Sequence, residues 1–334
     1  MHLSRPRTSF LFLLAFLFKA GAAFASATPS PALIVLNKQA DELVIVDPQT
    51  NQVVGRVPVG PDPHEVVVSP DGKLAYTSSY GAELDPHNTI SVVDLIAQKE
   101  LRRIDLGALR APHGLYVVAG KVYFTAEGSK AIGRYDPATN QIDMIQGLGQ
   151  IRTHMIVVTE DGKHIFTSNT GSNSVSVIEP GATPLAWNIA HIPVGKAPEA
   201  LELSPDGKEV WTAHAGDGGV SVIEVASKKV VQTIDARTKL SNRLKVTPDG
   251  KFVLISDLTG GELVVIDAHS RKVIKRVPMR GSPEEVLVAP DGSRAYVALE
   301  NDNRIDVVDI KTLTVTGTFN TGRGPDGMAW AVRQ

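Results

Sequence analysis

A turn motif that recurs at a nearly constant interval is the feature that most constrains the fold. Asp-Gly follows Pro or Glu at five places: Pro70-Asp71-Gly72, Glu160-Asp161-Gly162, Pro205-Asp206-Gly207, Pro248-Asp249-Gly250 and Pro290-Asp291-Gly292. From Asp to Asp the steps are 90, 45, 43 and 42 residues, and the long step holds two repeats with a shortened turn at Ala119-Gly120. Asp-Gly between two apolar runs favours a tight strand reversal, because Gly adopts the positive φ that such a turn needs. The chain is therefore built from one repeated unit.

Each repeat holds four short runs with the composition of β-strands. Residues 197–236 show an apolar run before Ser204, an aromatic and small-residue run, an alternating run at Val220–Glu224 and an amphipathic run at Lys229–Ile234. Four strands in a period of about 40 to 45 residues are typical of propeller blades. We therefore predict an all-β fold, a seven-bladed β-propeller of four-stranded antiparallel blades, in which residues 32–332 form one domain.

The two ends of the repeat array predict how the ring closes. The repeats span residues 32–60, 61–107, 108–149, 150–195, 196–236, 237–279 and 280–322, and the first of them lacks its first strand. Residues 323–332 resemble a first strand alone. We expect this C-terminal strand to complete the first blade, since a joint made from both chain ends leaves no open sheet edge.

The N-terminus has the three parts of a secretory signal peptide. Arg5 and Arg7 form a basic start, an apolar run covers residues 10–18, and Ala23-Phe24-Ala25 is a small-x-small cleavage motif. We expect residues 1–27 to be removed by cleavage after Ala25 or Ala27, since the apolar run is too short for a stable membrane span. The chain contains no Cys, which excludes disulfides and thiolate metal sites. This combination favours a bacterial periplasmic or secreted protein.

The composition favours a soluble globular protein without a strong charge bias. Hydrophobic residues make up 43% and charged residues 21% of the 334 residues, and the formal net charge is -2. Such a chain has no global electrostatic attraction to nucleic acid, so we expect no nucleic-acid partner. The partners that we expect are a small polar ligand or another exported protein, with the chain itself a monomer.

The repeat resembles that of the YVTN-repeat β-propeller family. The stretches SPDGKLAYTSS, TEDGKHIFTSN and APDGSRAYVAL each join the turn to an aromatic residue and then to small residues. The resemblance covers the whole chain after the signal peptide and implies the propeller fold. Relatives of this group include surface-layer and periplasmic propellers, the haem-binding propeller of cytochrome-type nitrite reductase, and lactonases. The motif is specific for the fold and says little about function, because propellers host many unrelated activities.

Function is expected where the repeats differ, around the mouth of the channel. The residue after the opening Pro of each inner strand, or after its equivalent, is polar in all seven blades: His64, His113, His154, Glu199, Arg243, Glu284 and Asp326. A second column, at the ends of the second strands, includes Glu127, Asn169, His214 and Asp257. The second strand runs antiparallel to the first, so both columns lie at the same face. We expect the ligand-binding residues there.

Three successive blades place His64, His113 and His154 in the first column, which favours a transition-metal site. Neutral imidazoles are common ligands of Zn, Cu, Fe and Ni, and Glu127 supplies a neighbouring carboxylate. A three-histidine site with an open position acts as a Lewis acid or lowers the pKa of a bound water. The alternative is that these side chains only line a water-filled channel, and the sequence leaves both open.

The charged half of the ring has its own alternatives. Arg243 is suited to clamp a carboxylate or phosphate, with acids such as Glu199 and Glu284 as orienting or acid–base groups. The same residues are equally suited to a self-satisfied ion-pair network. We hypothesise an exported propeller that binds a transition metal or a small polar ligand at the channel mouth. The alternatives are a scaffold that binds another protein without chemistry, and a lactonase-like or lyase-like enzyme that uses the same polar ring.

Overall fold

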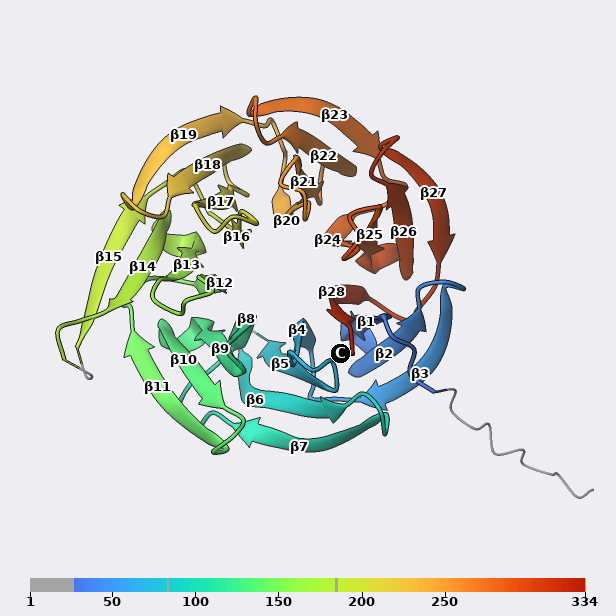
Figure 1. The fold of residues 1–334 in the computed structure, drawn as a ribbon, viewed down its shortest axis with the longest axis horizontal. Helices are drawn as coiled ribbons and strands as arrows, with labels where there is room; N and C mark the ends of the chain where they lie inside the picture. The colour runs from blue at the N-terminus through green and yellow to red at the C-terminus, as the bar shows by residue number, and fades with distance from the viewer. Residues whose placement is uncertain (1–26, 83, 184–185, 334) are drawn as a thin grey trace, which may run out of the picture.

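The computed structural model describes residues 27–82, 84–183 and 186–333, so the predicted signal peptide lies almost entirely outside the described residues. Seven four-stranded antiparallel sheets are arranged in a ring around a central channel (Figure 1). This confirms the predicted all-β, seven-bladed propeller. Within the described ranges, no helix is long and apolar enough to cross a membrane.

Each blade has one innermost strand beside the channel, and its other three strands follow outward in order. Blade 1 consists, from the inside out, of β28 (Pro325–Ala331), β1 (Ala32–Asn37), β2 (Glu42–Asp47) and β3 (Gln52–Pro58). Blade 2 consists of β4 (Pro63–Val68), β5 (Leu74–Ala82), β6 (Asp85–Asp94) and β7 (Lys99–Asp105). Blade 3 consists of β8 (Pro112–Val118), β9 (Lys121–Ala126), β10 (Ala131–Asp136) and β11 (Gln141–Gly147). Blade 4 consists of β12 (Thr153–Val158), β13 (Ile165–Asn169), β14 (Ser174–Pro180) and β15 (Trp187–Pro193).

The remaining three blades follow the same order. Blade 5 consists of β16 (Glu202–Leu203), β17 (Glu209–Ala213), β18 (Gly219–Glu224) and β19 (Lys229–Asp235). Blade 6 consists of β20 (Ser241–Val246), β21 (Phe252–Asp257), β22 (Glu262–Asp267) and β23 (Lys272–Pro278). Blade 7 consists of β24 (Pro283–Val288), β25 (Arg294–Leu299), β26 (Arg304–Asp309) and β27 (Thr314–Phe319).

The Asp-Gly turns form in the way that their sequence predicts. Gly72 has a φ of 70°, which a residue with a Cβ adopts only with strain. The Asp71 carboxylate accepts hydrogen bonds from the Ser69 hydroxyl at 2.6 Å and the Lys73 amide at 3.2 Å. These bonds replace backbone pairing inside the turn and hold the register of the inner hairpin. The face of the propeller that carries these turns is called the turn face below.

Short 3-10 turns join second to third strands at the opposite face in four of the blades, as far as the chain is described. They are η1 (Lys38–Ala40), η2 (Glu127–Ser129), η3 (Thr170–Ser172) and η4 (Glu300–Asp302). Each is followed by a non-glycine residue with positive φ, as at Lys130 with 53°. Because these turns lie beside the starts of the inner strands, they bring Lys38, Glu127 and Glu300 close to the channel mouth.

Apolar side chains fill the space between neighbouring blades. β1 buries all six of its residues, since both faces of the sheet pack against other blades. Ile34 and Leu36 of blade 1 belong to the same buried cluster as Val66 and Val93 of blade 2. The outermost strands instead alternate toward solvent, as the mixed exposure along β19 shows. The core therefore lies between the blades.

The ring closes as the two chain ends predict. β28 pairs antiparallel with β1, with Ile34 opposite Ala329 and Val35 opposite Met328. The C-terminal strand thus supplies the innermost strand of blade 1 (Figure 1). Pairing of distant chain ends covers the edge that β1 would otherwise expose.

Candidate functional site

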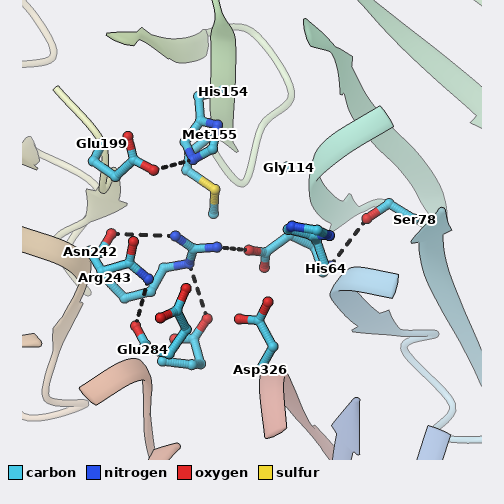
Figure 2. A network of polar contacts seen from close by, with 12 residues as sticks. His64, Ser78, Gly114, His154, Met155, Glu199, Asn242, Arg243, Glu284 and Asp326 are labelled. Atoms are coloured by element: carbon cyan, nitrogen blue, oxygen red, sulfur yellow. Dashed lines mark hydrogen bonds and ion pairs between the residues drawn. The ribbon is translucent and has the colours of Figure 1, made fainter. Parts of the chain in front are cut away.

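The polar column predicted at the strand starts does meet at one mouth of the channel. His64, His113 and His154 lie in β4, β8 and β12, and Arg243, Glu284 and Asp326 lie in β20, β24 and β28. Glu199 precedes the short strand β16, and its backbone N–H donates a hydrogen bond of 3.0 Å to the Ala213 carbonyl. Figure 2 shows the His154, Glu199, Arg243, Glu284 and Asp326 side chains directed toward one another around the axis. We call this the histidine mouth.

The three imidazoles form a contiguous aromatic cluster. The ring centres of His113 and His154 are 3.9 Å apart with a 36° tilt, and those of His64 and His113 are 5.1 Å apart. Tyr80 packs against the rings of both His64 and His113. His113 is enclosed on all these sides, and its burial, followed by the charges of His154 and His64, holds its pKa well below the usual value. His113 is therefore a neutral imidazole at neutral pH.

His154 lies between two carboxylates. Its Nδ1 is 2.9 Å from Glu127 Oε2, and its Nε2 is 2.7 Å from Glu199 Oε1. The second contact is close enough for an ion pair although it is not aligned as a hydrogen bond. Burial alone lowers the pKa of His154, but the two carboxylates outweigh it and raise the pKa to about 9. His154 is thus an imidazolium at neutral pH.

The predicted three-histidine metal site is not formed. Two imidazoles that bind one tetrahedral ion, each nitrogen about 2 Å from it, keep their ring centres about 5 Å apart. The ring centres of His113 and His154 are too close for this, and both nitrogens of His154 already face carboxylates. Across the described ranges, no three His, Asp or Glu side chains are arranged to hold a metal ion. Glu127, predicted as a further ligand, instead accepts hydrogen bonds from His154, Tyr80 and Arg152.

Arg243 crosses the channel at the inner side of the histidine mouth. Its Nη2 lies 2.5 Å from Glu65 Oε1 of blade 2, and its Nε lies 3.2 Å from Glu285 Oε2 of blade 7. Blades 6 and 2 are on opposite sides of the ring (Figure 1), so the Arg243–Glu65 pair spans the axis. All three side chains are almost fully buried. Arg243 therefore has the self-satisfied ion pairs that were one of its predicted alternatives.

Glu284 and Asp326 lie side by side at the mouth (Figure 2). Burial and the neighbouring charge of Asp326 raise the pKa of Glu284 to about 7. The Asp326 carboxylate is 1% exposed and pairs with Lys38, whose Nζ is 3.1 Å from Oδ2. Lys38 also contacts Glu300 at 3.2 Å. One lysine thus faces three carboxyl groups on this side of the mouth.

Several residues of this site were not among the predicted ones. Tyr80 comes from the β5–β6 hairpin, which is longer than its equivalents in the other blades, and its hydroxyl donates to Glu127 at 3.1 Å. Glu65 and Glu285 each follow a predicted residue directly in the chain. The sequence held no other sign that these two residues belong to the site, because they pair with Arg243, which comes from a different blade.

The second predicted column lies mostly inside the blades. Asn169 is buried and bonds to Ser174 and Ser176, while His214 bonds to Asp217 at 3.0 Å. Asp257 accepts the backbone amides of Lys239, Leu240 and Gly260. Glu127 is the member of this column that reaches the mouth, through its hydrogen bond with His154. The others hold loops and strand ends in place.

Comparison with known proteins supports the fold and nothing finer. No family model and no curated protein matches the sequence. The chain is similar to solved structures of several kinds. A proposed 6-phosphogluconolactonase from Bacteroides uniformis is 17% identical, with a TM-score of 0.75 over 90% of this chain and 99% of that one. Kuenenia stuttgartiensis hydrazine synthase is 21% identical, with a TM-score of 0.71 over 87% and 98%.

A further similar structure is the dihydro-heme d1 dehydrogenase NirN in complex with DHE. It is 15% identical, with a TM-score of 0.66 over 91% of this chain and 76% of that one. Identities this low show a shared propeller fold. They assign no activity, because one propeller scaffold carries unrelated sites.

Proposed function

We propose that the protein binds a small polar ligand at the histidine mouth. The observation that supports this most directly is unused hydrogen-bonding capacity at a buried site. Asp326 Oδ1 and His113 Nδ1 are buried and have no hydrogen-bond partner in the described part of the chain. Buried polar atoms are normally paired, so unpaired ones around a channel mouth favour a ligand that pairs them.

The chemistry of the mouth suits a ligand that carries hydroxyl or carbonyl groups. It combines a neutral imidazole at His113, an imidazolium at His154 and a carboxyl group at Glu284 whose pKa is about 7. Such a mixture offers both donors and acceptors. These groups sit at the ends of β-strands above the Arg243 ion pairs, so the ligand would meet a rigid floor.

A second candidate is hydrolysis of a lactone at the same mouth. The Glu284 carboxyl favours it, because a pKa of about 7 lets one group accept and return a proton near neutral pH. One structural neighbour is a proposed 6-phosphogluconolactonase, and the repeat motif resembles that of the YVTN-repeat family, which includes lactonases. The same proposal includes membership of that family, export to the periplasm or exterior, and a monomeric state.

Crystal soaking with a library of small polar fragments tests the binding proposal. We expect fragments within hydrogen-bond distance of Glu284, Asp326 or His113, and we expect Asp326→Asn to lose those that bind its Oδ1. Fragments bound only at other surfaces would overturn the proposal and favour the protein scaffold. Acid release from glucono-1,5-lactone tests the enzyme candidate. Turnover should disappear in Glu284→Gln and persist in Asp235→Asn, a change at an exposed outer strand.

A further inference from the structure

A second cavity lies in the channel on the far side of Arg243. Its volume is about 280 Å³, and all seven inner strands or the segments next to them contribute to its wall. The wall residues come later in these strands than the residues of the histidine mouth; Leu115 and Met155, for example, follow His113 and His154. The inner strands all start at the histidine mouth, so this cavity lies toward the turn face.

The cavity opens at the turn face. A wider cavity of about 850 Å³, lined by the turns at Thr159–Asp161 and Ser204–Gly207, shares Tyr116, Val117 and Glu202 with it. The two spaces are therefore neighbours, and Glu65 and Glu285 of the narrower one pair with Arg243. A molecule that enters from the turn face meets these pairs before it can reach the histidine mouth.

The narrower cavity is lined by both apolar and charged residues. Leu115, Met155, Leu201 and Leu287 are among its apolar residues, and the first three are almost fully buried. Its polar groups include Glu65, Glu202, Glu285 and Lys245. Apolar side chains beside a few charged groups fit a small molecule with a short hydrocarbon chain and one polar group.

Carboxyl groups outnumber basic groups around this cavity. Glu202 pairs with Lys245, whose Nζ is 2.9 Å from Oε2, and Glu65 pairs with Arg243. Glu285 then shares Arg243 through the longer 3.2 Å contact and has no basic partner of its own among the described residues. Three carboxyl groups thus face two cations, and the third is the most deeply buried, at 3% exposed.

The surplus carboxyl group holds a proton when nothing else neutralises it. The charged groups that face Glu285 are Arg243 and Lys245 of β20, Glu65 of β4 and Asp326 of β28. Burial, together with the repulsion from Glu65 and Asp326, outweighs the basic groups and raises the pKa of Glu285 to about 8. A positively charged group placed beside it would take the place of that proton.

We propose that this cavity binds a small aliphatic ammonium cation, with the charged group near Glu285 and the alkyl chain against the apolar side chains of the wall. Pockets for drug-sized ligands have volumes of roughly 300 Å³ or more. This cavity is slightly smaller, so its ligand has a short alkyl chain. Binding is coupled to ionisation: Glu285 releases its proton to solvent as the ammonium group arrives. This site is separate from the histidine mouth and does not depend on the function proposed there.

Calorimetry with hexylammonium tests the proposal on the wild-type protein, with hexanol and hexanoate as probes of equal chain length. We expect hexylammonium to bind at least tenfold more tightly than hexanoate. Titrations in buffers of different ionisation enthalpy at pH 7 should show release of close to one proton, because a group with a pKa of about 8 is mostly protonated there. The affinity should rise about tenfold between pH 6 and pH 7.

Two variants locate the binding. Glu285→Gln should remove the proton release and weaken hexylammonium at least tenfold, while it leaves hexanol unaffected. Leu201→Trp fills the cavity and should abolish binding of both, and Glu224→Gln, an exposed acid outside this cavity, should change neither. Tighter binding of hexanoate, absence of proton release in the wild type, or full hexylammonium affinity in Leu201→Trp would overturn the proposal. If a variant fails to fold, the number of protons that the wild-type protein releases on binding hexylammonium still tests the proposal.

Discussion

Arg243 reaches across the central channel to Glu65, and the two charged groups meet 2.5 Å apart between opposite blades. Together with the contact to Glu285, this ion pair divides the channel into two parts. The histidine mouth lies on one side, and a cavity lined by apolar and charged residues lies on the other. This division lets one scaffold present two chemically different sites.

Removal of this cation should destabilise the fold strongly. Arg243→Met leaves Glu65 and Glu285 buried without their shared partner, and we expect the free energy of unfolding to fall by about 3–5 kcal/mol. Chemical denaturation of the variant and the wild type at pH 7 measures this change in the free energy of unfolding. Arg237→Ala is the control, because its pair with Asp235 is exposed and should contribute at most about 1 kcal/mol. If Arg243→Met and Arg237→Ala lowered the unfolding free energy equally, the buried ion pairs of Arg243 across the channel would be contradicted.

The Glu199–His154 contact should give a pH-dependent stability. The pKa of His154 is raised from 6.5 to about 9 in the folded protein, so its contribution is fully present below pH 6.5 and is lost as the pH rises through 9. We expect Glu199→Gln to lower the free energy of unfolding by about 2–4 kcal/mol at pH 6 and by clearly less at pH 10. Denaturation at both pH values measures this. A deficit that does not change with pH would show that His154 is not charged.

Replacement of Glu284 should change stability in the opposite direction to Glu199→Gln, although the pKa of Glu284, like that of His154, is raised in the folded protein. The pKa of Glu284 is raised from 4.5 to about 7, so the folded protein favours its proton, and the stability that this gives is lost as the pH rises toward 7 and above. Glu284→Gln should therefore raise the unfolding free energy by about 1–3 kcal/mol at pH 8 and change little at pH 4, as denaturation at both pH values would show. A gain in stability together with a loss of fragment binding is typical of a functional residue. If Glu284→Gln lowered the unfolding free energy at pH 8, the buried position of Glu284 beside the Asp326 charge would be contradicted.

The seam between blades 1 and 7 should depend on the C-terminal strand. A chain that ends at Gly324 lacks β28 and leaves the apolar β1 edge unpaired. We expect loss of cooperative thermal unfolding and aggregation, because an exposed apolar strand pairs with other chains. Trp330→Phe keeps the strand and should remain soluble. A soluble truncated chain with an unchanged unfolding midpoint would show that the clasp is dispensable.

The fold could be predicted because the repeat carries its own geometry. Turns such as Pro205-Asp206-Gly207 set the period, the four runs set the strand number, and the lone strand at the C-terminus sets the closure. The column containing His64, His113 and His154 could also be predicted, because equivalent positions in equivalent strands lie at one end of the channel. Periodicity therefore locates the mouth residues without any knowledge of their rotamers.

The chemistry of that mouth could not be predicted in the same way. A column defines position along a strand but not side-chain direction, and the stacking of His113 on His154 depends on that direction. Nothing in the sequence pairs Arg243 with Glu65, which is 178 residues away. The carboxylates around His154 decide its protonation, and they come from a 3-10 turn and a neighbouring blade. For these reasons the sequence could not show that the three histidines, as the structure describes them, are not arranged to share a metal ion.

The protonation state of His154 distinguishes a polar mouth from a metal centre. Nitrogen NMR of histidine-labelled protein follows its ring from pH 5 to pH 10, without and with one equivalent of Zn²⁺. A polar site framed by Glu127 and Glu199 predicts that both ring nitrogens keep their protons to pH 8, with a midpoint near 9 that Zn²⁺ does not move. A midpoint below 7, or loss of a ring proton when Zn²⁺ is added, would contradict it.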